Sequence, residues 1–192
     1  LNWQKPYPKK QSNELKAFLR SSIKNKIKPV FALSPGMSID AGSTKDIKNL
    51  KNKINQAKKL GFRHFAIFFD DLDQKKDQNL ASSHAEILEL VSKLLKTLKG
   101  SSLMFCPTIY CNSFAEGDLS NNDYLLGLAS KVNKNLPLLW TGREVVSPNI
   151  KDTDISSLKK IFKNPVIIWD NYYANDYCSN KFFIGSYSGR SV

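Results

Sequence analysis

The chain of 192 residues contains only two histidines and three cysteines. Two histidines, His64 and His84, are too few for a histidine-rich zinc site, and they weaken any Ser-His or Cys-His hydrolase hypothesis. None of the cysteines, Cys106, Cys111 and Cys178, lies in a C-x-x-C motif. An odd number of scattered cysteines argues against a disulfide framework and favours a reducing compartment such as the cytoplasm.

Long apolar runs are also absent from the sequence. No stretch approaches the roughly 20 apolar residues that a membrane-spanning helix requires, and the first residues do not resemble a signal peptide. We therefore expect no membrane partner. The chain begins with Leu1 rather than Met, which is consistent with a piece excised from a longer protein.

Acidic residues are outnumbered, because 17 Asp and Glu stand against 29 Lys and Arg and give a formal net charge of +12. Such an excess of positive charge would favour binding to polyanions such as nucleic acid or acidic polysaccharide. Alternatively, it reflects a solvated, lysine-rich surface. The lysines are spread along expected helix faces, for example at Lys45, Lys48 and Lys51, without an arginine cluster or a nucleic-acid motif. We favour the solvated surface and predict no specific nucleic-acid partner.

Short apolar runs alternate with amphipathic stretches along the chain. The runs predict strands at residues 29–33, 64–69, 103–107, 136–140 and 165–169. Apolar residues spaced three or four apart predict helices near residues 12–26, 44–60, 81–98, 121–133 and 153–163. For the second helix, Ser43 with Asp46 predicts the N-terminal cap and Gly61 predicts the end.

Strands that alternate with helices in this way predict parallel β/α units. Right-handed crossovers bring the carboxyl end of every strand to the same rim, which is where (β/α)8 barrels place their catalytic loops. A doubly wound open sheet also uses these strand ends, but its glycine-rich first turn is absent from the sequence. The residues that follow the strands are therefore the candidates for a functional site.

Two adjacent acids, Asp70 and Asp71, end the apolar run at residues 64–69. Buried carboxylates are costly unless they are paired or used, although these two could simply cap the following turn. Because adjacent carboxylates repel, one should keep its proton to higher pH than the other, as a general acid with a charged partner requires. Side chains alternate along a strand, so both acids reach one pocket only if the strand gives way to a loop here.

The last expected strand end adds aromatic rings and amides to these acids. Residues 169–177 hold four aromatic residues and four Asn or Asp residues. Sugar sites need this mixture, because aromatic faces pack on the apolar face of a pyranose while carboxylates and amides bind its hydroxyls. Each residue alone could be a core aromatic or a turn former, but the run as a whole favours a carbohydrate site.

Ordered motifs extend this pattern over nearly the whole chain. They read FALSPG at 31–36, FFDD at 68–71, FCPT at 105–108, WTG and VVS within 140–147, WDN and ANDY within 169–177, and then Gly185, Tyr187, Gly189 and Arg190. In this order they resemble the catalytic domain of glycoside hydrolase family 84, the O-GlcNAcase and hyaluronidase-like β-N-acetylglucosaminidases.

The resemblance implies an α/β fold of the (β/α)8 TIM-barrel type, with residues 1–192 forming one catalytic domain that lacks the first two strands and the last. It implies retaining, substrate-assisted hydrolysis of terminal β-linked N-acetylglucosamine from glycans or O-GlcNAc-modified proteins, in which the acetamido oxygen of the sugar attacks. It implies no cofactor and no metal. The alternative is a non-catalytic, carbohydrate-binding remnant of such a barrel.

By the same resemblance, Asp70 would orient and polarise the acetamido N–H, and Asp71 would protonate the leaving oxygen and then activate water. The implied substrate-binding residues are Tyr110, Thr141 and Val145 around the acetamido group, Trp169 as a pocket wall, and Asn171 and Asp176 on the sugar hydroxyls. A Mg²⁺ enzyme using Asp70, Asp71 and Asp73 is a further alternative, which the lack of a phosphate-binding loop weakens.

Overall fold

The computed structural model describes residues 3–35, 38–72, 78–116, 118–174, 180 and 184–191. Within these residues, helices and strands alternate as the sequence predicts. The elements are α1 (Lys9–Lys24), β1 (Val30–Leu33), α2 (Thr44–Leu60), β2 (His64–Phe68), α3 (Gln78–Leu95), β3 (Ser102–Cys106), the short 3-10 helices η1 (Ser113–Ala115) and η2 (Leu119–Asn121), α4 (Asp123–Lys131), β4 (Leu138–Trp140), α5 (Asp152–Ile161) and β5 (Val166–Ile168).

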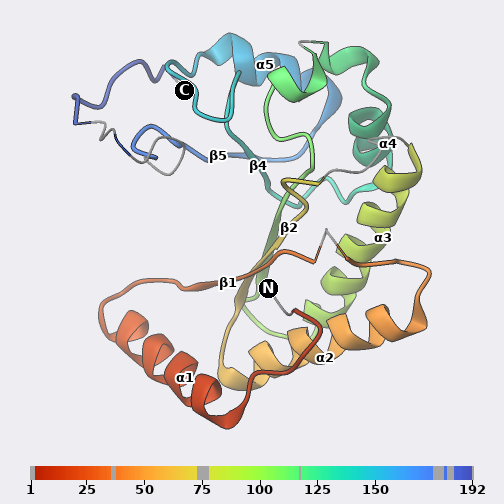
Figure 1. Cartoon of the computed structure of the whole chain (residues 1–192), viewed down its shortest axis with the longest axis vertical. Helices are drawn as coiled ribbons and strands as arrows, with labels where there is room; N and C mark the ends of the chain where they lie inside the picture. The colour runs from red at the N-terminus through yellow and green to blue at the C-terminus, as the bar shows by residue number, and fades with distance from the viewer. Residues whose placement is uncertain are drawn as a thin grey trace.

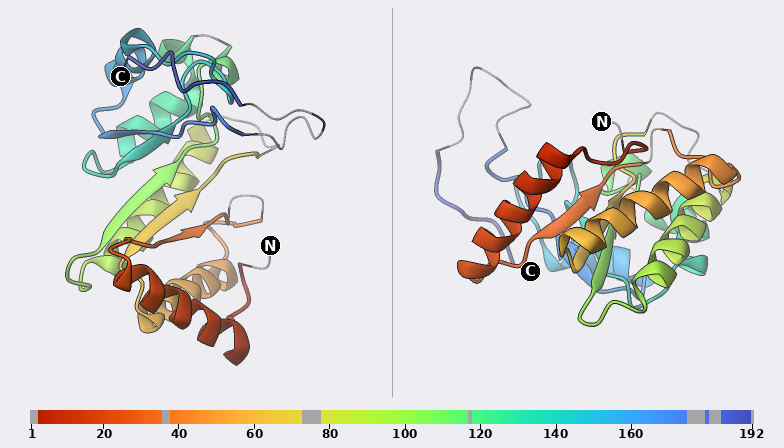
Figure 2. Two further views of the ribbon diagram at one scale, coloured as in Figure 1. Left: turned by 90° about the vertical axis from the view of Figure 1, so that its left-hand side faces the viewer. Right: turned by 90° about the horizontal axis from the view of Figure 1, so that it is seen from below.

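The strands form one parallel sheet in the order β1-β2-β3-β4-β5, so each strand pairs with the next one along the chain. The register places Ala32 beside Ala66 and Ala66 beside Met104. Figure 2 shows the arrows of β1, β2 and β3 running in the same direction. The predicted parallel β/α units are therefore confirmed, and all the strand ends point to one rim.

The helices follow the strands around the outside of the sheet. Figure 1 shows them in an arc, from α1 at the lower left through α2, α3 and α4 to α5 at the top, with the strands inside it. Neighbouring helices pack against one another along this arc. The apolar face of α3 is buried, with Leu88 and Val91 at most 1% exposed, as its helical spacing predicts.

Helix α2 shows why these boundaries can be read from the sequence. The Ser43 side chain accepts a hydrogen bond from the backbone N–H of Asp46, which satisfies one of the free donors at the helix start. Gly61 ends the helix in the left-handed conformation, at a φ of 115° that costs little only for glycine. Both predicted caps are confirmed.

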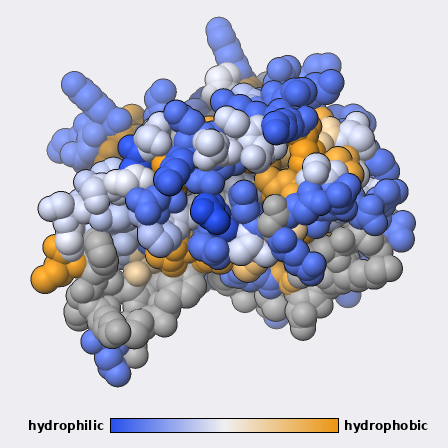
Figure 3. All heavy atoms as spheres, turned by 90° about the horizontal axis from the view of Figure 1, so that it is seen from above, coloured by the Kyte–Doolittle hydropathy of each residue, from blue (hydrophilic) through white to orange (hydrophobic). Residues whose placement is uncertain are grey.

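Charged and polar side chains cover much of the outside. Figure 3 shows the face seen from above, where hydrophilic residues predominate and hydrophobic areas are small and separate. Apolar side chains also reach the surface on α1, where Phe18 and Ile23 are exposed. No helix in the described part of the chain is long and apolar enough to cross a membrane.

Candidate active site

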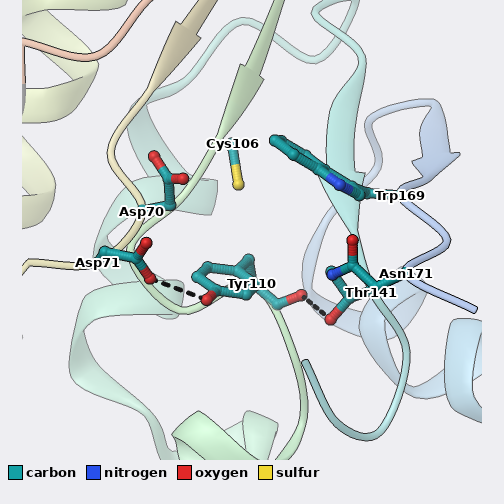
Figure 4. Close-up of a pocket in the computed structure, with 7 residues that line it drawn as sticks. All are labelled: Asp70, Asp71, Cys106, Tyr110, Thr141, Trp169 and Asn171. Atoms are coloured by element: carbon teal, nitrogen blue, oxygen red, sulfur yellow. Dashed lines mark hydrogen bonds between the residues drawn. The ribbon is translucent and has the colours of Figure 1, made fainter. Parts of the chain in front are cut away.

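A cavity of about 180 Å³ opens at the rim where the carboxyl ends of β2, β3, β4 and β5 meet (Figure 4). The residues that line it are Asp70, Asp71, Cys106, Tyr110, Thr141, Trp169 and Asn171. They belong to the ends of β2, β3, β4 and β5 or to the loops directly after them, so the predicted convergence is confirmed for four strand ends, while no described residue after β1 lines the cavity. We call Asp70 and Asp71 the acid wall, and Trp169 and Asn171 the aromatic wall.

The backbone at the acid wall explains how two consecutive acids reach one cavity. Strand β2 ends at Phe68, two residues before Asp70, and Asp71 has a φ of 53°. This left-handed conformation breaks the alternation that a strand would impose, and Asp adopts it more readily than most residues. The loop that the sequence required at this point is present.

Burial and charge separate the two acids. Asp70 is half-buried and Asp71 is exposed. Burial raises the pKa of Asp70, the negative charge of Asp71 raises it further, and a backbone hydrogen bond partly offsets both. The Tyr110 hydroxyl donates a hydrogen bond of 3.0 Å to Asp71. The raised pKa thus falls on Asp70, to which the resemblance gives the orienting role, and the expectation that the general acid of the pair carries it is wrong.

A buried group of side chains supports the acid wall from behind. Phe69, next to Asp70 and fully buried, stacks on the His84 ring with 3.8 Å between centroids. The Tyr124 hydroxyl accepts from the backbone N–H of Thr108 at 3.0 Å and lies 3.0 Å from His84 Nδ1. Burial lowers the pKa of His84 to about 3, so the ring is neutral, and Nδ1 and the Tyr124 hydroxyl share a hydrogen bond whose direction is set by the tautomer of the ring. This group joins the ends of β2 and β3.

The aromatic wall is tied to the neighbouring strand and loop. The Trp169 backbone N–H donates to the carbonyl of Trp140 at 2.9 Å, and its ring packs on Phe68 with 5.1 Å between centroids. The Asn171 side-chain amide donates to the Val145 carbonyl at 2.8 Å. In Figure 4 this wall faces the two acids across the cavity, with Tyr110 between them.

Four of the six predicted substrate-binding residues line the cavity, namely Tyr110, Thr141, Trp169 and Asn171. Val145 lies behind the lining, where it packs on the cluster around Cys106 and its carbonyl accepts from Asn171. Asp176 lies outside the described residues. Its predicted role, like the chemical roles of the others, stays a prediction.

Cys106, for which the sequence suggested no role, lies at the cavity between the two walls (Figure 4). Burial raises the pKa of its thiol, and the charges of Asp70 and Asp71 raise it further. The group therefore stays protonated and does not act as a thiolate nucleophile. Its position as the last residue of β3 was the available signal, because the residues at strand ends form the rim.

The described residues contain no group of three or more His, Cys, Asp or Glu side chains that could hold a metal ion. Asp70 and Asp71 face the cavity as a pair. The third acid of the Mg²⁺ hypothesis, Asp73, lies outside the described residues. The side chains that line this cavity are two carboxylates, a phenol, a hydroxyl, a thiol, an amide and an indole.

The model of the β-N-acetylglucosaminidase family matches residues 1–192, the whole chain. The chain belongs to this family. The resemblance to glycoside hydrolase family 84 that the motifs showed is therefore confirmed.

Individual relatives support the family assignment. The chain is 33% identical over 196 residues to the protein O-GlcNAcases of Mus musculus and Rattus norvegicus, a match that covers 99% of the chain. It is similar in structure to a mutant O-GlcNAc hydrolase of Thermobaculum terrenum, with a TM-score of 0.85, 30% identity and 98% of the chain covered. The chain spans 21% of the length of both curated relatives and 42% of that structure.

Proposed function

We propose that this chain forms the catalytic core of an enzyme that removes terminal β-linked N-acetylglucosamine from O-GlcNAc-modified proteins or glycans. The observation that carries the proposal is the acid wall, in which Asp70 and Asp71 face the same cavity as Trp169 and Asn171. A pyranose between the walls would have two carboxylates at one side and an indole and an amide at the other. Family membership and the O-GlcNAcase relatives support the same substrate class.

The proposal includes a complete (β/α)8 barrel around this site. The sequential parallel order of the strands and the arc of helices outside them support it, because a barrel is such a sheet closed on itself (Figure 1). In this arrangement residues 1–192 form a single catalytic domain with strands three to seven of the eight.

The first chemical step uses the substrate as its own nucleophile. The acetamido carbonyl oxygen attacks the anomeric carbon and forms an oxazoline, while Asp71 gives its proton to the departing glycosidic oxygen. The developing positive charge on the acetamido group is stabilised by Asp70, which accepts a hydrogen bond from the acetamido N–H and takes this proton as the neutral oxazoline forms. We further propose that the Tyr110 hydroxyl, which donates to Asp71, also contacts the acetamido group.

The second step reverses these proton transfers. Asp71, now a carboxylate, takes a proton from a water molecule, and the resulting hydroxide attacks the anomeric carbon and opens the oxazoline. Two inversions at one carbon give net retention. The acetamido N–H donated to Asp70 favours the charged form of this carboxyl and so opposes the burial that raises its pKa.

The proposal is tested with the full-length polypeptide that contains this chain and with 4-nitrophenyl N-acetyl-β-glucosaminide. We expect release of 4-nitrophenol with retention at the anomeric carbon, followed by NMR. Binding of N-acetylglucosamine or its thiazoline analogue without release would instead support the non-catalytic remnant. Insensitivity to EDTA is expected, and inactivation by EDTA would favour the Mg²⁺ alternative.

The role of Asp71 is tested with a series of leaving groups. Asp71→Ala should lose most activity towards poor leaving groups such as alkyl alcohols, and least towards activated phenols, because only poor leaving groups need the proton. Asp152→Asn, an exposed acid at the start of α5, is the matched control and should behave as wild type. An equal loss for all leaving groups in Asp71→Ala would contradict the acid role.

A further inference from the structure

The segment that carries the aromatic wall also contains one residue, Asp170, that does not line the cavity. Trp169 and Asn171 both line it, whereas Asp170 between them binds Arg190 on the other side. This is the alternation expected of extended backbone, in which every second side chain points the same way. A group that holds Asp170 therefore sets the direction of both neighbours at once.

The Arg190 guanidinium holds Asp170 with two bonds of 2.8 Å, from Nε to Oδ2 and from Nη2 to Oδ1. Its remaining donors bind backbone carbonyls. Nη2 donates to Ser147 at 3.1 Å, and Nη1 donates to Pro148 at 2.7 Å and to Ser188 at 2.9 Å. One side chain thus connects the segment after β5 to the loop after β4 and to residues near the chain end.

This ion pair is shielded from solvent more than an ordinary surface pair. The Arg190 side chain is 8% exposed and that of Asp170 is 19% exposed. The guanidinium lies 4.1 Å from the centre of the Tyr172 ring, and the Tyr187 hydroxyl donates to Asp170 at 2.8 Å. Charge-assisted, bidentate pairs in such surroundings have a fixed geometry as well as strength.

The backbone also fixes the position of Arg190. Residues 150 and 190 form a parallel β-bridge, in which the Ile150 N–H donates to Gly189 at 2.9 Å and the Ser191 N–H donates to Ile150 at 3.1 Å. Gly189 has a φ of 74°, and a Cβ there would clash with the Asn149 side chain. The β-bridge therefore holds the backbone of Arg190 in one position.

We propose that Arg190 is a positioning residue of the sugar pocket. Through Asp170 it orients Trp169 and Asn171, and through the carbonyls of residues 147–148 it ties this aromatic wall to the loop after β4. The inference rests on the proposed function, since the direction of the wall matters to catalysis only when a sugar fills the cavity. Arg190 itself does not line the cavity and acts through its neighbours.

The variant Arg190→Lys tests whether the positive charge alone is enough or whether the planar shape of the guanidinium is needed. An ammonium group can neutralise Asp170, but it cannot bind both carboxylate oxygens and three carbonyls in the planar arrangement that a guanidinium offers. In Arg190→Lys the contact between the Asn171 amide and the Val145 carbonyl, 2.8 Å in this structure, should loosen. A positioning role thus predicts a defect even where the positive charge is kept.

The test compares Arg190→Lys and Arg190→Ala with Arg143→Lys, an exposed arginine on the loop after β4, in the full-length polypeptide. We expect KM and the dissociation constant of the thiazoline analogue to rise on the order of tenfold in Arg190→Lys and further in Arg190→Ala. The dependence on leaving group should not change, which separates this defect from that of Asp71→Ala. The control should match wild type, and an unchanged KM in both Arg190 variants would overturn the proposal.

A double-mutant cycle tests whether Arg190 acts through the aromatic wall. Asn171→Ala should weaken thiazoline binding much less in the Arg190→Ala background than in wild type, because the amide is already misplaced there. If instead the two losses simply multiply, Arg190 acts independently of Asn171 and the proposal is wrong.

Hydrogen exchange distinguishes failure of this inference from failure of the proposed function. The backbone N–H groups of Trp169 and Tyr172 are hydrogen-bonded to the Trp140 carbonyl and to Asp170. Faster exchange at these two amides in Arg190→Lys, with unchanged exchange in α3, supports the positioning role even if the wild-type protein neither binds nor cleaves the sugar. Unchanged exchange there would overturn it while leaving any measured hydrolysis intact.

Discussion

The two walls of the cavity are held in place by different kinds of interaction. Behind the acid wall, Phe69, His84 and Tyr124 form a buried and uncharged group with ring stacking and neutral hydrogen bonds. Behind the aromatic wall, Asp170 and Arg190 form a bidentate ion pair nearer the surface. One cavity is thus shaped by two supports that respond differently to pH and to mutation.

This difference follows from what each wall does in the proposed reaction. A charge close to Asp70 would shift its pKa, so a neutral support leaves that acid under the control of its own burial and of Asp71. The aromatic wall transfers no proton, and an ion pair can hold it without disturbing the chemistry. In this candidate site, the residues behind each wall thus match the electrostatic needs of the wall that they hold.

The largest loss of stability is expected when the buried group behind the acid wall is truncated at Tyr124. Tyr124→Ala removes a fully buried ring and leaves both His84 and the Thr108 N–H without their partner. We expect a loss of about 3–5 kcal/mol in the free energy of unfolding, measured by urea denaturation. Tyr124→Phe, which keeps the ring and loses only the hydroxyl, should cost about 1–3 kcal/mol. Equal losses in the two variants would show that packing contributes little.

The next largest loss of stability is expected as the pH falls, and it arises from His84. Because burial holds the pKa of His84 at about 3, the unfolded chain takes up a proton below about pH 6.5 while the folded chain does not. Stability should therefore fall by roughly 3 kcal/mol between pH 6.5 and pH 4. In His84→Phe this contribution should be absent from urea unfolding measured across that range.

His64, half-buried at the start of β2, offers the matched control for this pH series. The His64→Phe variant should keep the acid-dependent loss that His84→Phe abolishes. If His64→Phe flattens the curve as strongly, the loss does not arise in the support of the acid wall.

The smallest loss of stability is expected from the ion pair between Asp170 and Arg190, and its pH dependence lies at lower pH than that of His84. Arg190 lowers the pKa of Asp170 to about 2, so the pair stabilises the fold above about pH 4 and is lost as the pH falls towards 2. Asp170→Asn should cost roughly 1–2 kcal/mol at neutral pH, because partial exposure screens the pair, and the deficit should shrink below pH 4. A deficit that is the same at pH 3 and pH 7 would contradict the ion-pair account.

The elements of the fold could be predicted because the signals for them are local. The spacing of Leu88 and Val91, the Ser43 cap and the Gly61 stop lie within a few residues of the boundaries that they set. The parallel sheet followed from the alternation of elements. The packing of α1 does not follow in this way, because its exposed Phe18 has the same apolar character as its buried Leu19.

The residues that line the candidate site could be predicted from the sequence, but the residues that hold them in place from behind could not. The lining residues Asp70, Tyr110 and Trp169 could be predicted because they follow strand ends, and the carboxyl ends of parallel strands lie at one rim. The partners of Asp170 and His84 lie 20 and 40 residues away in the sequence, and no local pattern links them. Side-chain pairing between distant segments requires the three-dimensional structure.

The left-handed backbone at Asp71 narrows the evolutionary choices open to this site. At a φ of 53°, Gly, Asn and Asp are tolerated far better than other residues, and only Asp among them carries an acid. A change to Glu would place a longer side chain on an unfavourable backbone. We therefore expect adaptation to other substrates to keep Asp71 and to proceed through the loops after β4 and β5, which carry the cavity-lining residues Thr141, Trp169 and Asn171.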